Sequence, residues 1–233
     1  MQMQLVKWKI AEHKMFDSSD SDDESSQASV QTLKVDWLDM SFMGCPQAVA
    51  LSGLPGCRFR NVYQNLHMDL NKIEDLGISD VVMLVTKGEL RKYRVSNLMN
   101  EYEMRGIRLH HYPFPDGTAP SIDNVMVVID TVRQALEENR KILIHCMGGL
   151  GRACVIASCL LQYFENSLTP DQTIFLLREL RGTRAIQTVK LLAGIYWVSL
   201  PLNRVLLSNT RTKLKMRPNS TSAANPLMKI FER

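Results

Sequence analysis

Apolar and polar positions alternate along the middle of the chain in a pattern that predicts strands separated by helices. Residues 32–38 alternate between apolar and polar side chains, which predicts a first strand at a sheet edge. The wholly apolar run at residues 81–85 predicts a strand buried in a parallel sheet. Further strands are expected at residues 107–114 and 142–144, and the second of these leads toward Cys146.

Helical periodicity fills the segments between these strands. Helices are expected at residues 62–76, 97–105 and 123–139, from the loop after Cys146 to about residue 166, from Thr169 to about Gly182, and at 187–207 with a kink near Pro201. Thr169 begins a capping box with proline at the first helical position. Strands alternating with helices predict an α/β fold, in which a mainly parallel central sheet is flanked by helices and ligands bind at the carboxyl ends of the strands.

A glycine-rich turn joins the strand ending at His145 to the next helix and is typical of an anion site. The turn runs from Cys146 to Arg152 and contains, in order, Met147, Gly148, Gly149, Leu150 and Gly151. Backbone N–H groups converge in such a turn, glycine allows close approach to a phosphate, and the helix N-terminus adds positive potential. The turn lacks the Gly-Lys-Ser/Thr ending of nucleotide-binding loops. Residues 147–152 are therefore expected to bind the phosphate of a substrate beside Cys146.

The side chains at the two ends of this turn are suited to attack on phosphorus. A thiol at the base of a cationic, N–H-lined cup favours its thiolate form, so Cys146 is the expected nucleophile. The guanidinium of Arg152 can hold two phosphate oxygens in a bidentate fork. The leaving oxygen needs a proton, and Asp116, thirty residues before Cys146 in a Pro/Gly turn, is the candidate acid. From the residues alone, Asp116 is an equally good turn-forming aspartate before Gly117.

The His-Cys-x5-Arg pattern of this turn resembles the signature of the cysteine-dependent protein phosphatases, including the dual-specificity group. Further segments extend the resemblance, over about residues 33–190, to the cyclin-dependent-kinase-associated phosphatase family. These segments are LPGCRFRNV (54–62), TKGELRKYRV (86–95), PFPDG (113–117) and LRELRGTRAIQT (177–188).

This resemblance implies roles for residues outside the turn. It makes Asp116 the general acid and Gln187 the residue that orients the water in hydrolysis of the phosphocysteine. The other interpretation of Gln187 is a surface glutamine at a helix start. His145 is expected to support the turn through hydrogen bonds, because side chains alternate along a strand and this one faces away from Cys146.

The resemblance also implies a substrate. It indicates a dual-specificity protein phosphatase that hydrolyses phosphothreonine, and also phosphotyrosine and phosphoserine, on the activation segment of a cyclin-dependent kinase. We therefore expect a phosphorylated cyclin-dependent kinase as partner, a monomer, no cofactor or metal ion, and neither nucleic acid nor membrane as ligand. An enzyme acting on an RNA 5′ end or a phosphoinositide stays open, although only the basic residues 204–217 favour it. The spacing of Cys146 and Arg152, with Asp116 upstream, disfavours a rhodanese-type sulfur transferase.

One residue departs from the family pattern. The position after the signature arginine is usually Ser or Thr in this superfamily, and here it is Ala153. That hydroxyl is thought to stabilise the cysteine thiolate as the leaving group when the phosphoenzyme breaks down. Losing one hydrogen bond to a charged sulfur costs about 1.5–3 kcal/mol, or about ten- to a hundredfold in rate. We expect a slow but active phosphatase, and the alternative is a nearly inactive, phosphate-trapping binding partner of kinases.

Length and composition outline the domain. A chain of 233 residues favours one domain, expected at residues 32–207 with tails at 1–31 and 208–233. Residues 16–29 are rich in Ser and Asp and too poor in apolar side chains to bury a core, so we expect disorder there. This segment is either a solubilising acidic linker or a set of kinase acceptors at serines such as Ser18.

Charge is unevenly distributed over the chain. Residues 1–31 carry a net charge of −3 and residues 204–233 carry +6, within a total of +4. Arg91, Lys92 and Arg94 form a local basic patch, for which a solvated face is favoured over a docking site.

The cysteines indicate a reducing environment. The chain has five cysteines, an odd number, and their spacing shows no pairs. The sequence also shows no secretory signal and no apolar run long enough to span a bilayer. The cytoplasm, with the nucleus as an additional site, is the expected compartment. Cys154 and Cys159 are expected to be core thiols, and either is a candidate partner for an oxidised Cys146.

Overall fold

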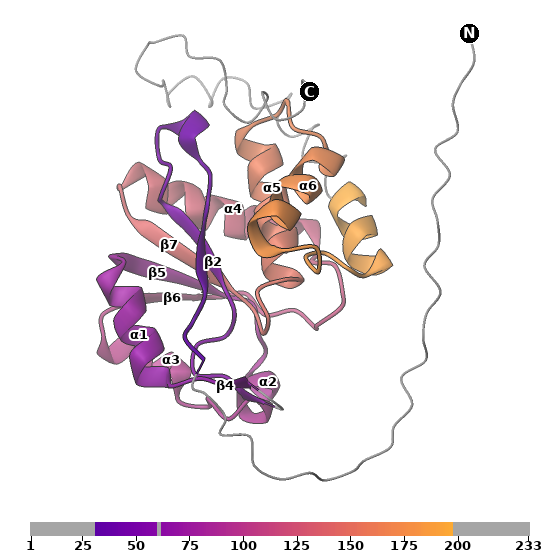
Figure 1. The fold of residues 1–233 in the computed structure, drawn as a ribbon. Coiled ribbons are helices and arrows are strands. Elements are labelled where there is room, and N and C mark those ends of the chain that lie inside the picture. The colour runs from indigo at the N-terminus through magenta and orange to yellow at the C-terminus, as the bar shows by residue number, and fades with distance from the viewer. Residues whose placement is uncertain (1–30, 60–61, 198–233) are drawn as a thin grey trace, which may run out of the picture.

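The computed structural model describes residues 31–59 and 62–197 of the chain, and its centre is a five-stranded sheet (Figure 1). The strand order is β1-β2-β7-β5-β6, with β1 at Val35–Leu38, β2 at Val49–Ser52, β5 at Ile78–Met83, β6 at Arg108–His111 and β7 at Lys141–His145. β1 is antiparallel to β2, and the other neighbouring pairs are parallel. The predicted α/β fold with a mainly parallel sheet is confirmed, and β1 lies at the sheet edge as its alternating pattern indicated.

Helices cover both faces of this sheet. Their bounds are α1 Leu66–Asp75, α2 Lys87–Lys92, α3 Leu98–Met104, α4 Ile122–Glu137, α5 Arg152–Phe164 and α6 Pro170–Arg181, and residues 189–197 are also helical. α1 and α3 lie on one face, while α4, α5 and α6 lie on the other (Figure 1). A separate hairpin pairs β3 at Arg58–Phe59 with β4 at Val62–Tyr63, and a short 3-10 helix spans Ser41–Met43. None of the described helices is long and apolar enough to cross a membrane.

α5 anchors the loop that follows β7. Its residues 152–162 are all buried, as expected for a helix that is apolar around most of its circumference. It packs against β2 and β7 and lies between α4 and α6. The loop at residues 146–151 is therefore suspended between two buried elements at the carboxyl ends of the parallel strands, where the sequence placed the ligand site.

Side-chain capping sets the start of α1. The periodicity predicted a helix from residue 62, but residues 62–63 form β4 and the helix begins at Leu66. The side chain of Asn65 accepts a hydrogen bond from the Met68 N–H at 3.2 Å and so satisfies one of the free N–H groups of the first turn. The prediction is wrong for the residues before this cap.

The other helix starts agree better with the sequence. Thr169 forms the predicted capping box, with its hydroxyl accepting a hydrogen bond from the Gln172 N–H at 3.3 Å. The last predicted helix, at residues 187–207, is present at 189–197, and the expected kink near Pro201 lies outside the described residues. The expected tails at residues 1–31 and 208–233 also lie outside the described residues, apart from Gln31.

A buried carboxylate ties β5 to its neighbours. The Asp80 side chain is fully buried and contacts Arg108 at 3.2 Å, His110 at 2.9 Å and also Arg140. Burial raises the pKa of Asp80, but hydrogen bonds from Arg140, His110 and Arg108 outweigh burial and hold that pKa well below its ordinary value. Asp80 therefore stays ionised and links β5 to β6 and to the segment before β7.

We expect acid to weaken the fold through Asp80. Because its pKa is lower in the folded chain than the unfolded value of about 3.9, its contribution is present above about pH 4 and is lost as the pH falls toward the folded pKa. Asp80→Asn should lower the free energy of unfolding by about 3 kcal/mol at neutral pH, since it leaves partly buried arginines without their carboxylate. Urea unfolding at a series of pH values measures both effects. An unchanged pH dependence in Asp80→Asn would contradict the assignment.

Candidate active site

The loop between β7 and α5 turns its backbone carbonyls outward. The carbonyl oxygens of residues 147–150 all accept hydrogen bonds from surrounding elements. The Leu54 N–H donates to the residue 147 carbonyl at 2.9 Å, and the Ile186 N–H donates to the residue 150 carbonyl at 2.9 Å. Arg181 donates to the two carbonyls between them, at 3.5 Å for residue 148 and 3.2 Å for residue 149. In a trans peptide the N–H points opposite to the preceding C=O, so the N–H groups of residues 148–151 point into the loop. Within residues 31–59 and 62–197, none of these N–H groups donates a hydrogen bond, which leaves them available to an anion.

Gly149 is required by the packing of this loop. Its φ is +67°, and a Cβ at this position would lie 2.4 Å from both the Ser52 carbonyl oxygen and the Arg181 Nη2. The backbone therefore crosses the end of β2 too closely for any side chain. Gly148 has open space around it and Gly151 would meet only a leucine methyl, so the other two glycines are not demanded by the protein's own packing.

The two end residues of the loop lie at its base. Cys146 is 3% exposed and directly follows β7. Arg152 begins α5 and is fully buried, a costly position for a guanidinium unless its donors are paired. Its Nη1 donates to the carbonyl oxygens of Leu84 at 3.1 Å and Phe114 at 3.0 Å.

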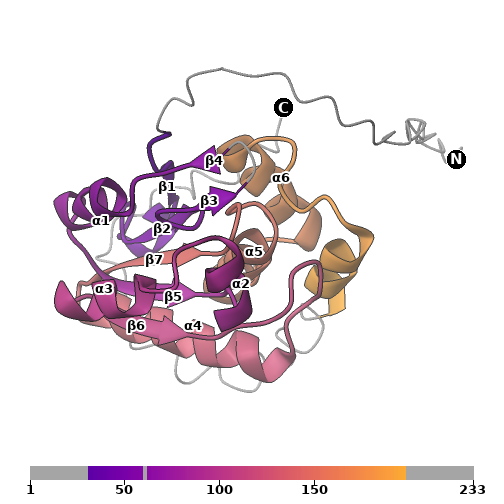
Figure 2. The ribbon, with the colours of Figure 1, turned by 90° about the horizontal axis from the view of Figure 1, so that it is seen from below.

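Glu89 also pairs with Arg152, a role that no sequence pattern predicted. Its carboxylate accepts from Arg152 Nη1 at 2.9 Å and Nη2 at 2.6 Å, and Figure 2 shows α2 beside the N-terminal end of α5. The same carboxylate caps α2 by accepting from the Thr86 N–H at 2.8 Å. The capping box of Thr86 and Glu89 was visible in the sequence, but nothing there connected it to an arginine 63 residues later.

Charge is concentrated at this pair. Burial raises the pKa of Glu89, but hydrogen bonds from Arg152 and Thr86 outweigh burial and hold it below its ordinary value. Burial likewise lowers the pKa of Arg152, and the hydrogen bonds to Glu89 and the charge of Cys146 more than reverse that effect. The buried guanidinium is therefore a permanent cation next to Cys146.

One edge of the guanidinium remains available. Arg152 Nε has no hydrogen-bond partner among the described residues, and Asp116 Oδ1 lies 3.3 Å from it. The Asp116 side chain is 59% exposed, in a turn closed by a hydrogen bond from the Thr118 hydroxyl to the Pro115 carbonyl at 2.7 Å. The structure thus brings Asp116 to the Cys146–Arg152 loop, as the sequence predicted.

His145 lies behind the loop. It is fully buried, and its Nε2 is 3.1 Å from the Tyr102 hydroxyl of α3. Burial lowers the pKa of His145 to about 3, so the ring is neutral at physiological pH. Its hydrogen bond braces the end of β7 against α3, and its carbonyl accepts from the Leu84 N–H at 3.0 Å. This position of His145, behind the loop and bonded to Tyr102, agrees with the prediction that its side chain faces away from Cys146.

Gln187 lies at the rim of the same loop. It is exposed and follows Ile186, whose backbone N–H is bonded to the Leu150 carbonyl and whose φ is +55°. This contact places Gln187 next to residues 147–151 although the two segments are distant in sequence. The prediction that it lies at the site is compatible with this placement.

The residues after Arg152 form the packed wall of the site. Ala153 is fully buried and carries no hydroxyl. The Cys154 thiol donates to the Gly149 carbonyl at 3.4 Å, and burial raises the pKa of both Cys154 and Cys159 to about 12. The prediction of core thiols is confirmed. Among the described residues, no group of three or more His, Cys, Asp or Glu side chains is arranged to hold a metal ion.

Comparison with known proteins agrees with this geometry. Residues 8–174 match the family model described as Cyclin-dependent kinase inhibitor 3. The rat protein of that name is 44% identical over 178 residues, covering 75% of this chain and 82% of the relative. The human protein is 42% identical over 175 residues, with the same shares covered.

The similarity extends to a solved structure. A crystal structure of kinase associated phosphatase, with serine replacing its catalytic-site cysteine, has a TM-score of 0.70 and 39% identity, covering 74% of this chain and 97% of that one. The chain therefore belongs to the cyclin-dependent kinase inhibitor 3 family, and it is a cysteine-dependent dual-specificity phosphatase.

Proposed function

We propose that the chain removes phosphate from protein threonine, and also from tyrosine and serine, through a phosphocysteine on Cys146. The observation that carries this proposal is the orientation of the loop: the carbonyls of residues 147–150 are bonded to surrounding elements, so the N–H groups of residues 148–151 point into the loop that begins at Cys146. The buried guanidinium of Arg152, paired with Glu89, adds a cation at the end of this loop. Such a cup stabilises the equatorial oxygens of a phosphoryl group in transfer.

The reaction has two balanced steps. In the first, the Cys146 thiolate forms an S–P bond, the P–O bond to the substrate breaks, and Asp116 gives its proton to the leaving oxygen. In the second, water attacks phosphorus, its proton passes to Asp116, and the S–P bond breaks with the electron pair returning to sulfur. Gln187, at the loop rim, is suited to orient that water. Asp116 Oδ1 lies 3.3 Å from Arg152 Nε, so the proposed acid is beside the guanidinium that would hold the substrate phosphate.

The substrate is proposed from the relatives. Their names describe cyclin-dependent kinase inhibitors and a kinase associated phosphatase, which supports a kinase as partner. We take the phosphothreonine of a cyclin-dependent kinase activation segment as the substrate. The described chain contains five free cysteines, which supports a reducing compartment such as the cytoplasm or nucleus.

The central test is a time course of phosphate release from a cyclin-dependent kinase phosphorylated on its activation threonine. Cys146→Ser should lower turnover by on the order of 10⁴-fold, because serine is a poor nucleophile without a base. Asp116→Asn should cost about 10²–10⁴-fold on phosphothreonine and less on p-nitrophenyl phosphate, whose leaving group needs little protonation. A single sub-stoichiometric burst with tight kinase binding would identify a phosphate-trapping partner instead. Absence of both release and binding would refute the kinase assignment.

A second prediction concerns Ala153. Ala153→Ser introduces the hydroxyl that the superfamily usually carries after the signature arginine. It should speed phosphoenzyme hydrolysis by about ten- to a hundredfold, as expected for one hydrogen bond to a charged group. Rapid-quench measurement of the phosphoenzyme separates this step from its formation. A lower melting temperature with an unchanged rate would mean that the hydroxyl does not reach the sulfur and is simply buried without a partner.

A third prediction concerns Glu89 as a positioning residue. Glu89→Gln removes the charge and one acceptor from Arg152, so kcat/KM should fall about ten- to a hundredfold and inhibition by orthovanadate, a phosphate analogue, should weaken in parallel. Glu89 also caps α2, and Thr86→Ala is the control for the cap. It removes the hydroxyl that accepts from the Glu89 N–H at 3.2 Å and donates to the Glu89 carboxylate at 3.0 Å, but leaves that carboxylate its charge and its hydrogen bonds to Arg152. That control should cost about 1 kcal/mol of stability and leave vanadate inhibition unchanged. Equal effects of the two variants on vanadate would show that only the helix cap matters.

A further inference from the structure

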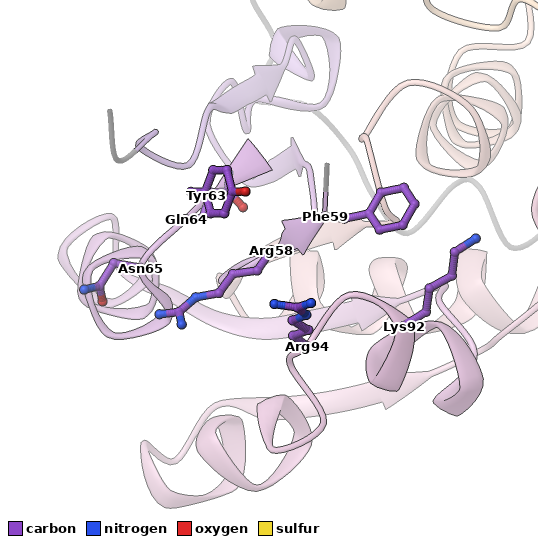
Figure 3. A pocket seen from close by; sticks show the side chains of 7 residues that line it. All are labelled: Arg58, Phe59, Tyr63, Gln64, Asn65, Lys92 and Arg94. Carbon is purple, nitrogen blue, oxygen red and sulfur yellow. The ribbon is translucent and has the colours of Figure 1, made fainter. Parts of the chain in front are cut away.

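A basic pocket lies between the β3–β4 hairpin and the end of α2 (Figure 3). Its volume is about 600 Å³, and its lining residues are Arg58, Phe59, Tyr63, Gln64, Asn65, Lys92 and Arg94. The lining contains three cations and no carboxylate. Figure 3 shows Arg58 and Arg94 between the hairpin and the end of α2, with Lys92 on the side of Phe59. The pocket is outside the Cys146 loop and has no part in the reaction described above.

The cations of this pocket are not neutralised by the folded domain. Within the described ranges, Arg58, Lys92 and Arg94 form no ion pair, although seven other Lys or Arg side chains do. Lys92 is held in place by aromatic faces, with its Nζ 5.1 Å from the Phe59 ring centroid and 5.7 Å from that of Tyr93. Three like charges gathered at one concave surface repel one another, and an anion in the pocket would relieve that repulsion.

The backbone at Arg94 is an independent sign that this side chain matters. Arg94 has φ of +58°, the left-handed conformation that usually takes glycine after a helix. The turn is closed by hydrogen bonds from the Arg94 N–H to Arg91 O at 3.1 Å and from the Val95 N–H to Leu90 O at 2.9 Å. A residue with a Cβ pays about 1 kcal/mol here. Glycine would avoid this strain but would add no side chain, whereas Arg94 adds a guanidinium to the pocket lining.

The acidic end of the same chain enters the domain at this pocket. The Gln31 N–H donates to the Tyr63 carbonyl at 3.0 Å, and Gln31 pairs with Gln64 in a parallel bridge, so the first described residue touches two lining residues. Residues 17–24 before it carry five carboxylates. Only six residues separate Glu24 from Gln31, and they can span at most about 20 Å.

We propose that residues 17–24 bind in this basic pocket in cis, with their carboxylates on Arg58, Lys92 and Arg94. Linkage through a short connection gives the segment an effective concentration of order millimolar at the pocket, more than a separate acidic ligand would reach. The opposite end of the chain, residues 204–233, carries +6 and is repelled by the same cations. Because α2 carries Glu89 as well as Lys92, the bound segment lies on the element that positions Arg152.

Zero-length carbodiimide cross-linking of the full-length chain, read by mass spectrometry, tests this proposal. The reagent joins a lysine to a carboxylate only where the two are in contact. We expect an intramolecular cross-link from Lys92 to a carboxylate of residues 17–24. It should be lost in about 1 M salt, where the Debye length is about 3 Å, and lost in Arg58→Gln/Arg94→Gln at low salt.

The chain offers matched controls. Lys87→Gln/Arg91→Gln removes the same amount of charge from α2, at two positions outside the pocket lining, and the cross-link should persist there. Lys34, with its side chain 68% exposed, is ten residues from Glu24 and reports sequence proximity alone. Both pocket arginines are exposed, so melting temperatures of the variants should equal that of the parent chain.

Several outcomes would overturn the proposal. These are cross-links that go to Lys34 or to lysines of residues 204–233 in place of Lys92, cross-links that join two chains, or a Lys92 cross-link that is indifferent to Arg58→Gln/Arg94→Gln. Lower kcat/KM on a phosphoprotein in that variant, together with no Lys92 cross-link in the parent chain, would assign the pocket to an acidic side chain of the substrate instead.

Discussion

The structure depends on the burial of one charge. Arg152 sits at the end of a fully packed helix, and its guanidinium is kept there by Glu89 from α2 and by the carbonyls of Leu84 and Phe114. These partners come from three separate segments, so the pairing fixes the positions of α2, the end of β5 and the Asp116 loop relative to α5. A buried cation without such partners would be expelled or would unfold its surroundings. The remaining donor of the guanidinium, Nε, lies 3.3 Å from Asp116 Oδ1.

The conformation of the loop after Cys146 is likewise set by hydrogen bonds from surrounding elements. Each of its carbonyls at residues 147–150 is satisfied from outside, which leaves only donors on the inner face. Arg181 supplies two of these contacts and is itself paired with Asp36 at the edge of the sheet. The backbone N–H groups of this loop therefore add to the Arg152 cation as donors for an anion, and a single added Cβ at Gly149 would break the arrangement.

Much of the fold and site could be read from the chain because the signals are local. The apolar run at residues 81–85, the capping box at Thr169 and the Cys-x5-Arg spacing each act over a few residues. The capping box and the loop are where they were predicted, and the apolar run overlaps the buried strand β5, which spans Ile78–Met83. β2 was not predicted, because Val49–Ser52 is four residues long and buried on both faces, which leaves no alternation to detect. The start of α1 was misplaced because the Asn65 cap, rather than apolar spacing, decides it.

The sequence by itself determined the chemistry class, because the residue types and spacing of Cys146 and Arg152 across a glycine turn predict attack on phosphorus. Only the tertiary structure decided which groups serve them. Glu89 and Asp116 reach Arg152 from 63 and 36 residues away, and the sheet order β7-β5-β6 is what brings those segments together. The meeting of Gln31 with the pocket of Arg58 and Arg94 was equally hidden, since contacts between distant segments depend on packing that no local pattern records.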